Sequence, residues 1–135
     1  MVDKNTTNIS LTPELRNRLV AGVRRLCGEC TIYLFGSYAV GTAGPSSDLD
    51  IAVIVDKVGS KIDMAAQLWK ELSDIPLPKD IVVTTSEEFR FYRNEPGSVY
   101  RTIADKGQLL YGQAPPDPRG QWGSAIAGAT VALWS

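Results

Sequence analysis

Histidine is absent from the 135 residues of this chain, and cysteine occurs only twice. The absence of histidine excludes Ser-His-Asp and Cys-His catalysis, HExxH zinc sites, and proton shuttles built on imidazole. If the chain is an enzyme, carboxylates, hydroxyls and backbone amides must therefore carry its chemistry. Those groups are suited to hard divalent cations and to phosphate.

An excess of charge of one sign is also absent, because 14 Lys and Arg residues stand against 15 Asp and Glu residues, for a net charge of −1. A chain with this balance has no basic field of the kind that holds nucleic acid or an anionic membrane. No apolar stretch approaches the ~20 residues that a membrane-spanning helix needs. The first residues are polar and show no signal peptide, so we expect a cytoplasmic protein.

The two cysteines form a single Cys-x-x-Cys pair, Cys27 and Cys30. A thioredoxin-type pair follows a strand and opens a helix, whereas this pair is expected to end a helix and precede a strand. A zinc site needs two further Cys or His ligands, which the chain lacks. We therefore expect Cys27 to pack against the core and Cys30 to lie in a turn.

Helical and extended patterns alternate between residues 11 and 111, which predicts one domain of the α/β (α+β) class, a small mixed β-sheet flanked by helices. The predicted strands are Thr31–Phe35, Asp48–Val55, Asp80–Thr84 and Leu109–Tyr111, the last at an edge. Helices are expected to start at Pro13, near Met64, at Ser86 and at Asn94–Pro96, with a helical turn over residues 37–42. Residues 1–10 are expected to form a loose arm, and the Pro- and Gly-rich residues 112–135 a loosely ordered tail.

Four arginines lie on the first predicted helix, namely Arg16, Arg18, Arg24 and Arg25. They are interpreted either as a solvated face or as contacts to phosphate, and the spacing does not separate the two.

Two aspartates, Asp48 and Asp50, lead into the most apolar predicted strand. Residues two apart on a strand point to the same face, with their Cα atoms ~6.5 Å apart. Two neighbouring carboxylates at the mouth of an apolar strand repel each other unless a cation lies between them. With no Lys or Arg in that strand, a bound Mg²⁺ or Mn²⁺ is the natural partner.

A third carboxylate, Asp80, begins the next apolar strand, and a neighbouring strand would bring it to the same edge as Asp48 and Asp50. Three carboxylates on adjacent strand ends are able to hold two metal ions, the arrangement used for in-line displacement at phosphorus. Asp80 could instead take the proton of an attacking hydroxyl. The sequence leaves both roles open.

A phosphate-binding segment is predicted at Gly36 and Ser37, directly after the first predicted strand. A glycine there lets the backbone approach a ligand closely, and the amides that follow favour anionic oxygens. Ser47, which precedes Asp48, is a further candidate contact to the nucleotide. Taken singly, each of these residues also fits an ordinary turn or loop.

The combination of Gly36-Ser37, ten residues, and Asp48-Leu49-Asp50 resembles the signature of the polymerase-β-like nucleotidyltransferase superfamily. The segments from Ser86 to Tyr100 and Leu109–Tyr111 resemble its small bacterial and archaeal members. These minimal nucleotidyltransferases are often paired, as antitoxins, with a helical HEPN-domain toxin. The resemblance covers residues 12–111 and leaves the tail unmatched.

This resemblance implies that Asp48, Asp50 and Asp80 are the catalytic, Mg²⁺-binding carboxylates and that Gly36 and Ser37 bind the triphosphate. The implied reaction transfers AMP from ATP to a hydroxyl, in the paired systems a tyrosine of the HEPN partner, and releases pyrophosphate. Two alternatives stay open. The chain could be a non-catalytic antitoxin that occludes its partner, or a free-standing enzyme whose homo-oligomer supplies a pocket for a small hydroxylated substrate.

Overall fold

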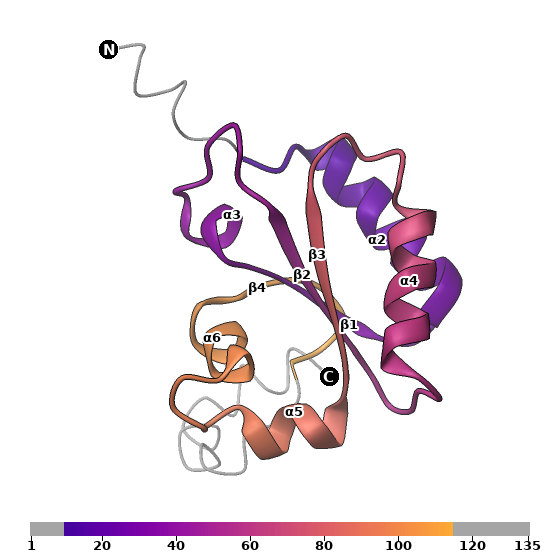
Figure 1. The fold of residues 1–135 in the computed structure, drawn as a ribbon, viewed down its shortest axis with the longest axis vertical. Helices are drawn as coiled ribbons and strands as arrows, with labels where there is room; N and C mark the ends of the chain where they lie inside the picture. The colour runs from indigo at the N-terminus through magenta and orange to yellow at the C-terminus, as the bar shows by residue number, and fades with distance from the viewer. Residues whose placement is uncertain (1–9, 115–135) are drawn as a thin grey trace.

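The computed structural model describes residues 10–114, which contain every strand and helix that the sequence predicts (Figure 1). The predictions for the arm and for most of the tail concern residues outside this range. The helices are α2 (Pro13–Cys27), α3 (Ser37–Val40), α4 (Lys61–Glu71), α5 (Ser86–Tyr92) and α6 (Val99–Lys106). The strands are β1 (Thr31–Phe35), β2 (Leu49–Val55), β3 (Lys79–Thr85) and β4 (Gln108–Tyr111).

The four strands form one mixed sheet in the order β3-β2-β1-β4, which confirms the predicted fold class. Strand β2 runs parallel to β3 and antiparallel to β1, and β4 pairs antiparallel with β1. Six of the seven residues of β2 are buried, because the strand lies inside the sheet and both of its faces are covered. Strand β4 lies at an edge, as its short apolar run predicts.

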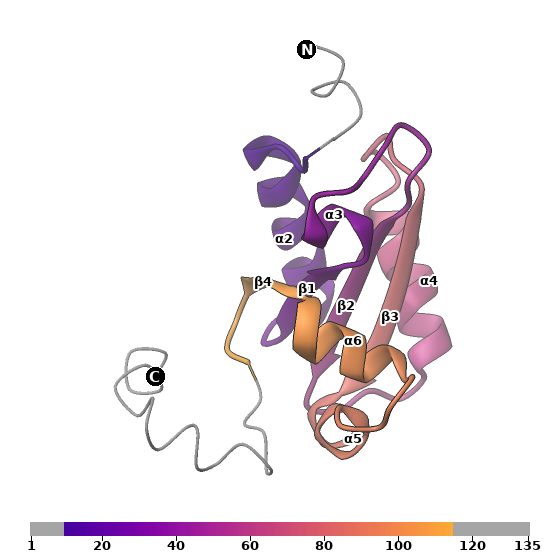
Figure 2. The ribbon, with the colours of Figure 1, turned by 90° about the vertical axis from the view of Figure 1, so that its left-hand side faces the viewer.

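Helices cover both faces of the sheet. Figure 1 shows α2 and α4 on one side and α3 and α6 on the other, and the turned view of Figure 2 places α3 and α6 in front of the strands. The core between α2, α4 and the sheet includes Leu19, Val23, Ile51 and Leu68. On the opposite face Phe89 and Ile103, from α5 and α6, pack against β1 and β2. None of the helices within residues 10–114 is both long and apolar enough to cross a bilayer.

The first helix begins and ends where its sequence predicts. The Thr12 hydroxyl accepts a hydrogen bond from the Leu15 N–H at 3.2 Å, Pro13 occupies the first turn, and Gly28 ends the helix with φ +68°. The start of α6 was predicted too early, at Asn94–Pro96. The helix begins at Val99, because the Ser98 hydroxyl caps it by accepting from the Arg101 N–H.

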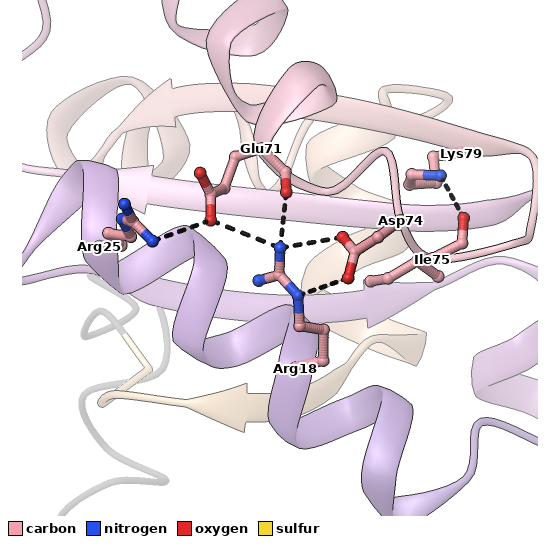
Figure 3. A network of polar contacts seen from close by, with 6 residues as sticks. All are labelled: Arg18, Arg25, Glu71, Asp74, Ile75 and Lys79. Atoms are coloured by element: carbon pink, nitrogen blue, oxygen red, sulfur yellow. Dashed lines mark hydrogen bonds and ion pairs between the residues drawn. The ribbon is translucent and has the colours of Figure 1, made fainter.

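The arginines of α2 divide between two environments. Arg18 forms hydrogen-bonded ion pairs with Asp74 and Glu71, and Arg25 lies 3.9 Å from Glu71, so both tie α2 to the end of α4 (Figure 3). The Arg24 guanidinium lies 4.5 Å from the centre of the Tyr111 ring. These contacts are structural. Arg18 is therefore engaged within the protein, rather than forming a solvated face or a contact to phosphate.

The Cys-x-x-Cys pair joins α2 to β1, as predicted. Cys27 Sγ lies 3.8 Å from Met64 Sδ, and both cysteines are free thiols packed against the core. Burial, with smaller contributions from Cys27 and Glu29, raises the pKa of the Cys30 thiol to about 11. A thiol with so high a pKa is a poor nucleophile at neutral pH, which agrees with a packing role.

Candidate active site

The site is built around the junction where β1 passes into α3. Gly36 occupies that junction with φ +74° and ψ −155°, a conformation that side-chain-bearing residues rarely adopt. In the sheet, Phe35 pairs with Asp50, so Gly36 lies beside the start of β2. A Cβ added to Gly36 would overlap the Oδ2 atom of Asp50. The glycine predicted to let the backbone approach a ligand is thus also the residue that makes room for this carboxylate.

The parallel register of β2 and β3 brings two of the predicted carboxylates together. Asp50 is the Cα partner of Asp80, so the two lie side by side and on the same face of the sheet. Asp48 directly precedes β2, at the same end of the sheet. The intervening Leu49 is fully buried in the opposite direction, which fixes how the Asp-x-Asp segment faces. Asp48 and Asp80 are exposed, and Asp50 is half-buried.

The surroundings of Asp50 disfavour the charged form of its carboxyl group. Burial, followed by the negative charges of Asp80 and Asp48, raises the pKa of the Asp50 carboxyl above its ordinary value of 3.8. The three carboxylates therefore repel one another in the isolated chain, as the sequence predicts for acidic groups at the mouth of an apolar strand.

The donor set fits a divalent cation. Carboxylate oxygens without imidazole or thiolate are the ligands of Mg²⁺ and Mn²⁺, and a cation would relieve the repulsion that raises the Asp50 pKa. Within residues 10–114 no group of three or more Cys, Asp or Glu side chains is already arranged to hold a metal. Like charges separate when no cation lies between them, which agrees with this spread of the three carboxylates.

In the predicted phosphate-binding segment, Ser37 keeps its hydroxyl available, whereas the Ser47 hydroxyl already accepts a hydrogen bond from the protein. At the start of α3 the N–H groups of Ser37 and Tyr38 have no acceptor within the helix, since the first turn provides none. The Ser37 hydroxyl makes no hydrogen bond to any other residue of the described range, so it is available to a ligand. The Ser47 hydroxyl instead accepts from the Gly44 N–H at 2.9 Å and holds the loop before β2, although it keeps its own proton to donate.

The segment before Asp80 contains contacts that the sequence interpretation missed. Lys79 donates from its ammonium to the carbonyl oxygens of Ile75 and Leu77, each at 2.9 Å, and its own carbonyl accepts from the Trp69 indole N–H at 3.3 Å. Trp69 stands next to the buried Leu68 in the apolar pattern of α4, but it is 51% exposed. It lies at the rim of the core because its N–H bonds to this backbone and its ring lies beside the lysine ammonium.

Cavity volume does not point to this site. A hollow of about 570 Å³ lies at the opposite end of the sheet, lined by Thr31, Ile54, Asp56 and Ser86 among others, and by none of the three aspartates. The carboxylates lie instead at the other end of the sheet, where the side chains of Asp48 and Asp80 are exposed. The chemistry of the side chains, rather than the depth of a hollow, therefore identifies the candidate site.

The fold and the site together define a class: a small α/β protein with carboxylates and a glycine turn at one end of a mixed sheet, suited to metal-assisted chemistry on phosphates. The model of the family described as "Polymerase beta, Nucleotidyltransferase" matches residues 30–115, which include β1 to β4 and all six predicted site residues. The chain belongs to this nucleotidyltransferase family. The resemblance drawn from Gly36-Ser37 and Asp48-Leu49-Asp50 is thereby confirmed at the level of the family.

Solved structures with this fold include chains from toxin–antitoxin complexes. One chain comes from a toxin–antitoxin crystal structure with AMP-PNP, with a TM-score of 0.51, 22% sequence identity, and coverage of 87% of this chain and 95% of that chain. Another comes from a mutant of the toxin–antitoxin pair MntA-HpeT, with a TM-score of 0.51, 23% identity, and coverage of 86% and 94%. At this identity the likeness shows the fold. No curated protein matches the sequence.

Proposed function

We propose that this chain is a Mg²⁺-dependent nucleotidyltransferase that moves AMP from ATP to a hydroxyl of a partner protein, as an antitoxin that adenylylates a HEPN toxin. The observation that carries the proposal is the pairing of Asp50 with Asp80, beside Asp48 and the Gly36 turn, at one open end of the sheet. Membership of the nucleotidyltransferase family supports the reaction type. The AMP-PNP complex with the same fold supports an adenine nucleotide as donor.

In this proposal the aspartates bind the metal ion, and the Gly36-Ser37 turn binds the triphosphate. Asp48 and Asp50 would hold Mg²⁺, which supplies positive charge to the phosphate oxygens and to the departing pyrophosphate. The amides of Ser37 and Tyr38 and the Ser37 hydroxyl donate hydrogen bonds to the triphosphate, and Gly36 keeps the backbone close to it. Ser47 could add its hydroxyl proton as one further donor.

The transfer exchanges one phosphorus–oxygen bond for another. The acceptor oxygen attacks the α-phosphorus, the bond from that phosphorus to the oxygen bridging to the β-phosphate breaks, and pyrophosphate leaves with the bonding electrons. The proton of the acceptor hydroxyl passes to a base, and the pairing of Asp80 with Asp50 beside the proposed metal site supports Asp80 in this role. Asp80 as a third metal ligand is the alternative role.

A protein is the acceptor that best fits the site. The carboxylates lie at an open end of the sheet, Asp48 and Asp80 are exposed, and the net charge of −1 offers no track for nucleic acid. The toxin–antitoxin complexes that share the fold support a HEPN-type partner, whose tyrosine would be the acceptor. A cytoplasmic location is expected for such a pair.

The test uses ATP labelled at the α-phosphate, with Mg²⁺ and either host-cell extract or a purified HEPN partner. We expect a labelled protein band with the wild type, no label with Asp48→Ala, and normal labelling with Asp63→Ala, a matched exposed aspartate at the start of α4. Label in the small-molecule fraction without a partner would instead support the free-standing enzyme. Absence of label, with Asp48→Ala still neutralising the toxin, would support neutralisation by occlusion.

A further inference from the structure

A lysine clip holds the backbone directly before Asp80. The ammonium of Lys79 donates to two carbonyl oxygens of the preceding connector, those of Ile75 and Leu77, and Figure 3 shows the first of these bonds. The ammonium also lies 5.4 Å from the centre of the Trp69 ring, and the Trp69 N–H donates to the Lys79 carbonyl. Lys79 is thereby fixed by both the connector and α4.

The connector needs such a clip because of its composition. Its sequence is Ile75-Pro76-Leu77-Pro78, and the two prolines have no N–H with which to hold a defined turn. The Leu77 N–H bonds back to the Ile75 oxygen at 2.8 Å, and the lysine ammonium adds two further bonds. The Ile75 N–H bonds in turn to the Leu72 oxygen at 3.0 Å, so hydrogen bonds hold the connector along its length.

The same connector also holds the start of β2. The Leu49 N–H donates to the Pro78 oxygen at 2.8 Å. The residue before Asp50 and the residue before Asp80 are therefore both anchored to one rigid segment. Strand β3 is an edge strand, so its first residues are held by β2, by this connector and by Trp69 of α4.

We infer that Lys79 is a positioning residue for the metal-binding carboxylates, because its clip on the connector keeps Asp80 opposite Asp50. The inference rests on the proposed function, since it assigns the clip to the same Mg²⁺ site. Lys79 does not itself contact the nucleotide or the metal ion. It acts through the backbone that carries Asp80.

The test measures Mn²⁺ affinity of the whole chain, without nucleotide or partner, by the paramagnetic resonance signal of free Mn²⁺. We expect Lys79→Met to bind Mn²⁺ roughly ten-fold more weakly, at the lower end of the loss seen when outer contacts of metal ligands are removed. Lys79→Arg, which keeps a fork of donors for the two carbonyls, should restore most of the affinity. Lys70→Met, the matched control on the exposed end of α4, should bind as the wild type does.

The sign of the effect separates positioning from simple charge. Loss of a positive charge does not by itself weaken the binding of a cation, so unchanged or tighter Mn²⁺ binding by Lys79→Met would overturn the inference. A merely structural lysine would lower the melting temperature and leave the affinity unchanged. If Lys79→Met does not fold, Lys79→Gln, which retains an amide donor, provides the same comparison with a smaller expected loss.

The control Asp50→Asn separates this inference from the proposed function. Weak binding by Asp50→Asn together with wild-type binding by Lys79→Met would remove only the role of the clip. Failure of the wild type to bind Mn²⁺ would remove the metal site and the clip's role together.

Discussion

Two groups of acidic residues in this fold have opposite surroundings. On the α2–α4 side, the guanidinium of Arg18 lowers the pKa of the Asp74 carboxyl below its ordinary value. At the end of the sheet, burial and the charges of Asp80 and Asp48 raise the pKa of Asp50. The first group is neutralised by the chain itself, whereas the second is left to be neutralised by something that binds. This difference distinguishes carboxylates that stabilise a fold from carboxylates that form a site.

A second carboxylate that the chain itself neutralises, Glu88 of α5, shows the same contrast with Asp50. Lys61 donates to both carboxylate oxygens of Glu88 at 2.9 Å, Thr84 donates to the same group, and these bonds lower the pKa of Glu88. Within residues 10–114 the carboxylate with a clearly raised pKa is therefore the one at the predicted metal site.

The largest expected effect comes from Asp50→Asn. We expect nucleotidyl transfer to fall by more than about 100-fold, because even outer contacts of metal ligands contribute 10- to 100-fold to metal affinity. The same substitution should leave the fold intact or raise the melting temperature, since it removes a buried, repelled charge. Transfer assays and thermal unfolding of the same preparation measure both quantities. Unchanged transfer would contradict the metal assignment.

The substitution Gly36→Ala tests whether the position of the Asp50 carboxylate depends on the glycine turn beside it. A side chain at φ +74° and ψ −155° costs on the order of 1–3 kcal/mol, and the new Cβ would also push the Asp50 carboxylate from its position. We expect transfer to fall by about ten-fold or more, with a loss on the order of 1–3 kcal/mol in the free energy of unfolding measured by urea denaturation. Gly59→Ala is the matched control, because no atom lies within 4 Å of a Cβ added there. Equal activity of the two variants would show that Gly36 is an ordinary turn residue.

The pH dependence of stability should have opposite signs in the two regions. Because the folded-state pKa of Asp50 is raised, its contribution to stability is present below pH 3.8 and is lost as the pH rises through the raised value. For Asp74 the pKa is lowered, so its contribution is present above pH 3.8 and is lost as the pH falls through the lowered value.

The measurement is urea unfolding of the wild type and Asp50→Asn at several pH values. The stability advantage of Asp50→Asn should shrink as the pH falls from 7 toward 3.8, because the wild-type carboxyl becomes protonated. Mn²⁺ binding by the wild type should weaken over the same interval, since protons compete for the ligand. An advantage that does not change with pH would show that Asp50 is not repelled by its neighbours.

The sequence predicted the parts of this contrast that depend on local pattern. The Asp-x-Asp spacing indicated that Asp48 and Asp50 share a face, and the apolar runs after Asp50 and Asp80 indicated two buried strands. Turn and capping residues such as Thr12 and Gly28 predicted the limits of α2. These features were readable because each depends on residues a few positions apart.

Contacts between distant segments could not be predicted in the same way. Arg18 and Asp74 are 56 positions apart, and nothing in either segment indicates the other as its partner. The direct pairing of Asp50 with Asp80 depends on the parallel register of two strands joined by a helix. The exposure of Trp69 goes with its bond to the backbone carbonyl of Lys79, a contact that helical periodicity does not indicate.

The smallest expected effect comes from Arg18→Met, which tests the stabilising side of the comparison. The guanidinium bonds to Asp74 at 2.8 and 2.9 Å and to the Glu71 carbonyl at 2.7 Å, and methionine preserves the apolar stem without these bonds. We expect a loss of about 1 kcal/mol in the free energy of unfolding, kept small because about a third of the side chain is exposed to water. Transfer activity below the melting temperature should be unchanged.

The matched control is Arg16→Met. Arg16 is an exposed arginine of the same helix without an ion pair in the described range, so this variant should show no loss of stability. A fall in transfer with Arg18→Met, at wild-type stability, would mean that the two groups of carboxylates are coupled, and that the chain does not separate its stabilising charges from its site.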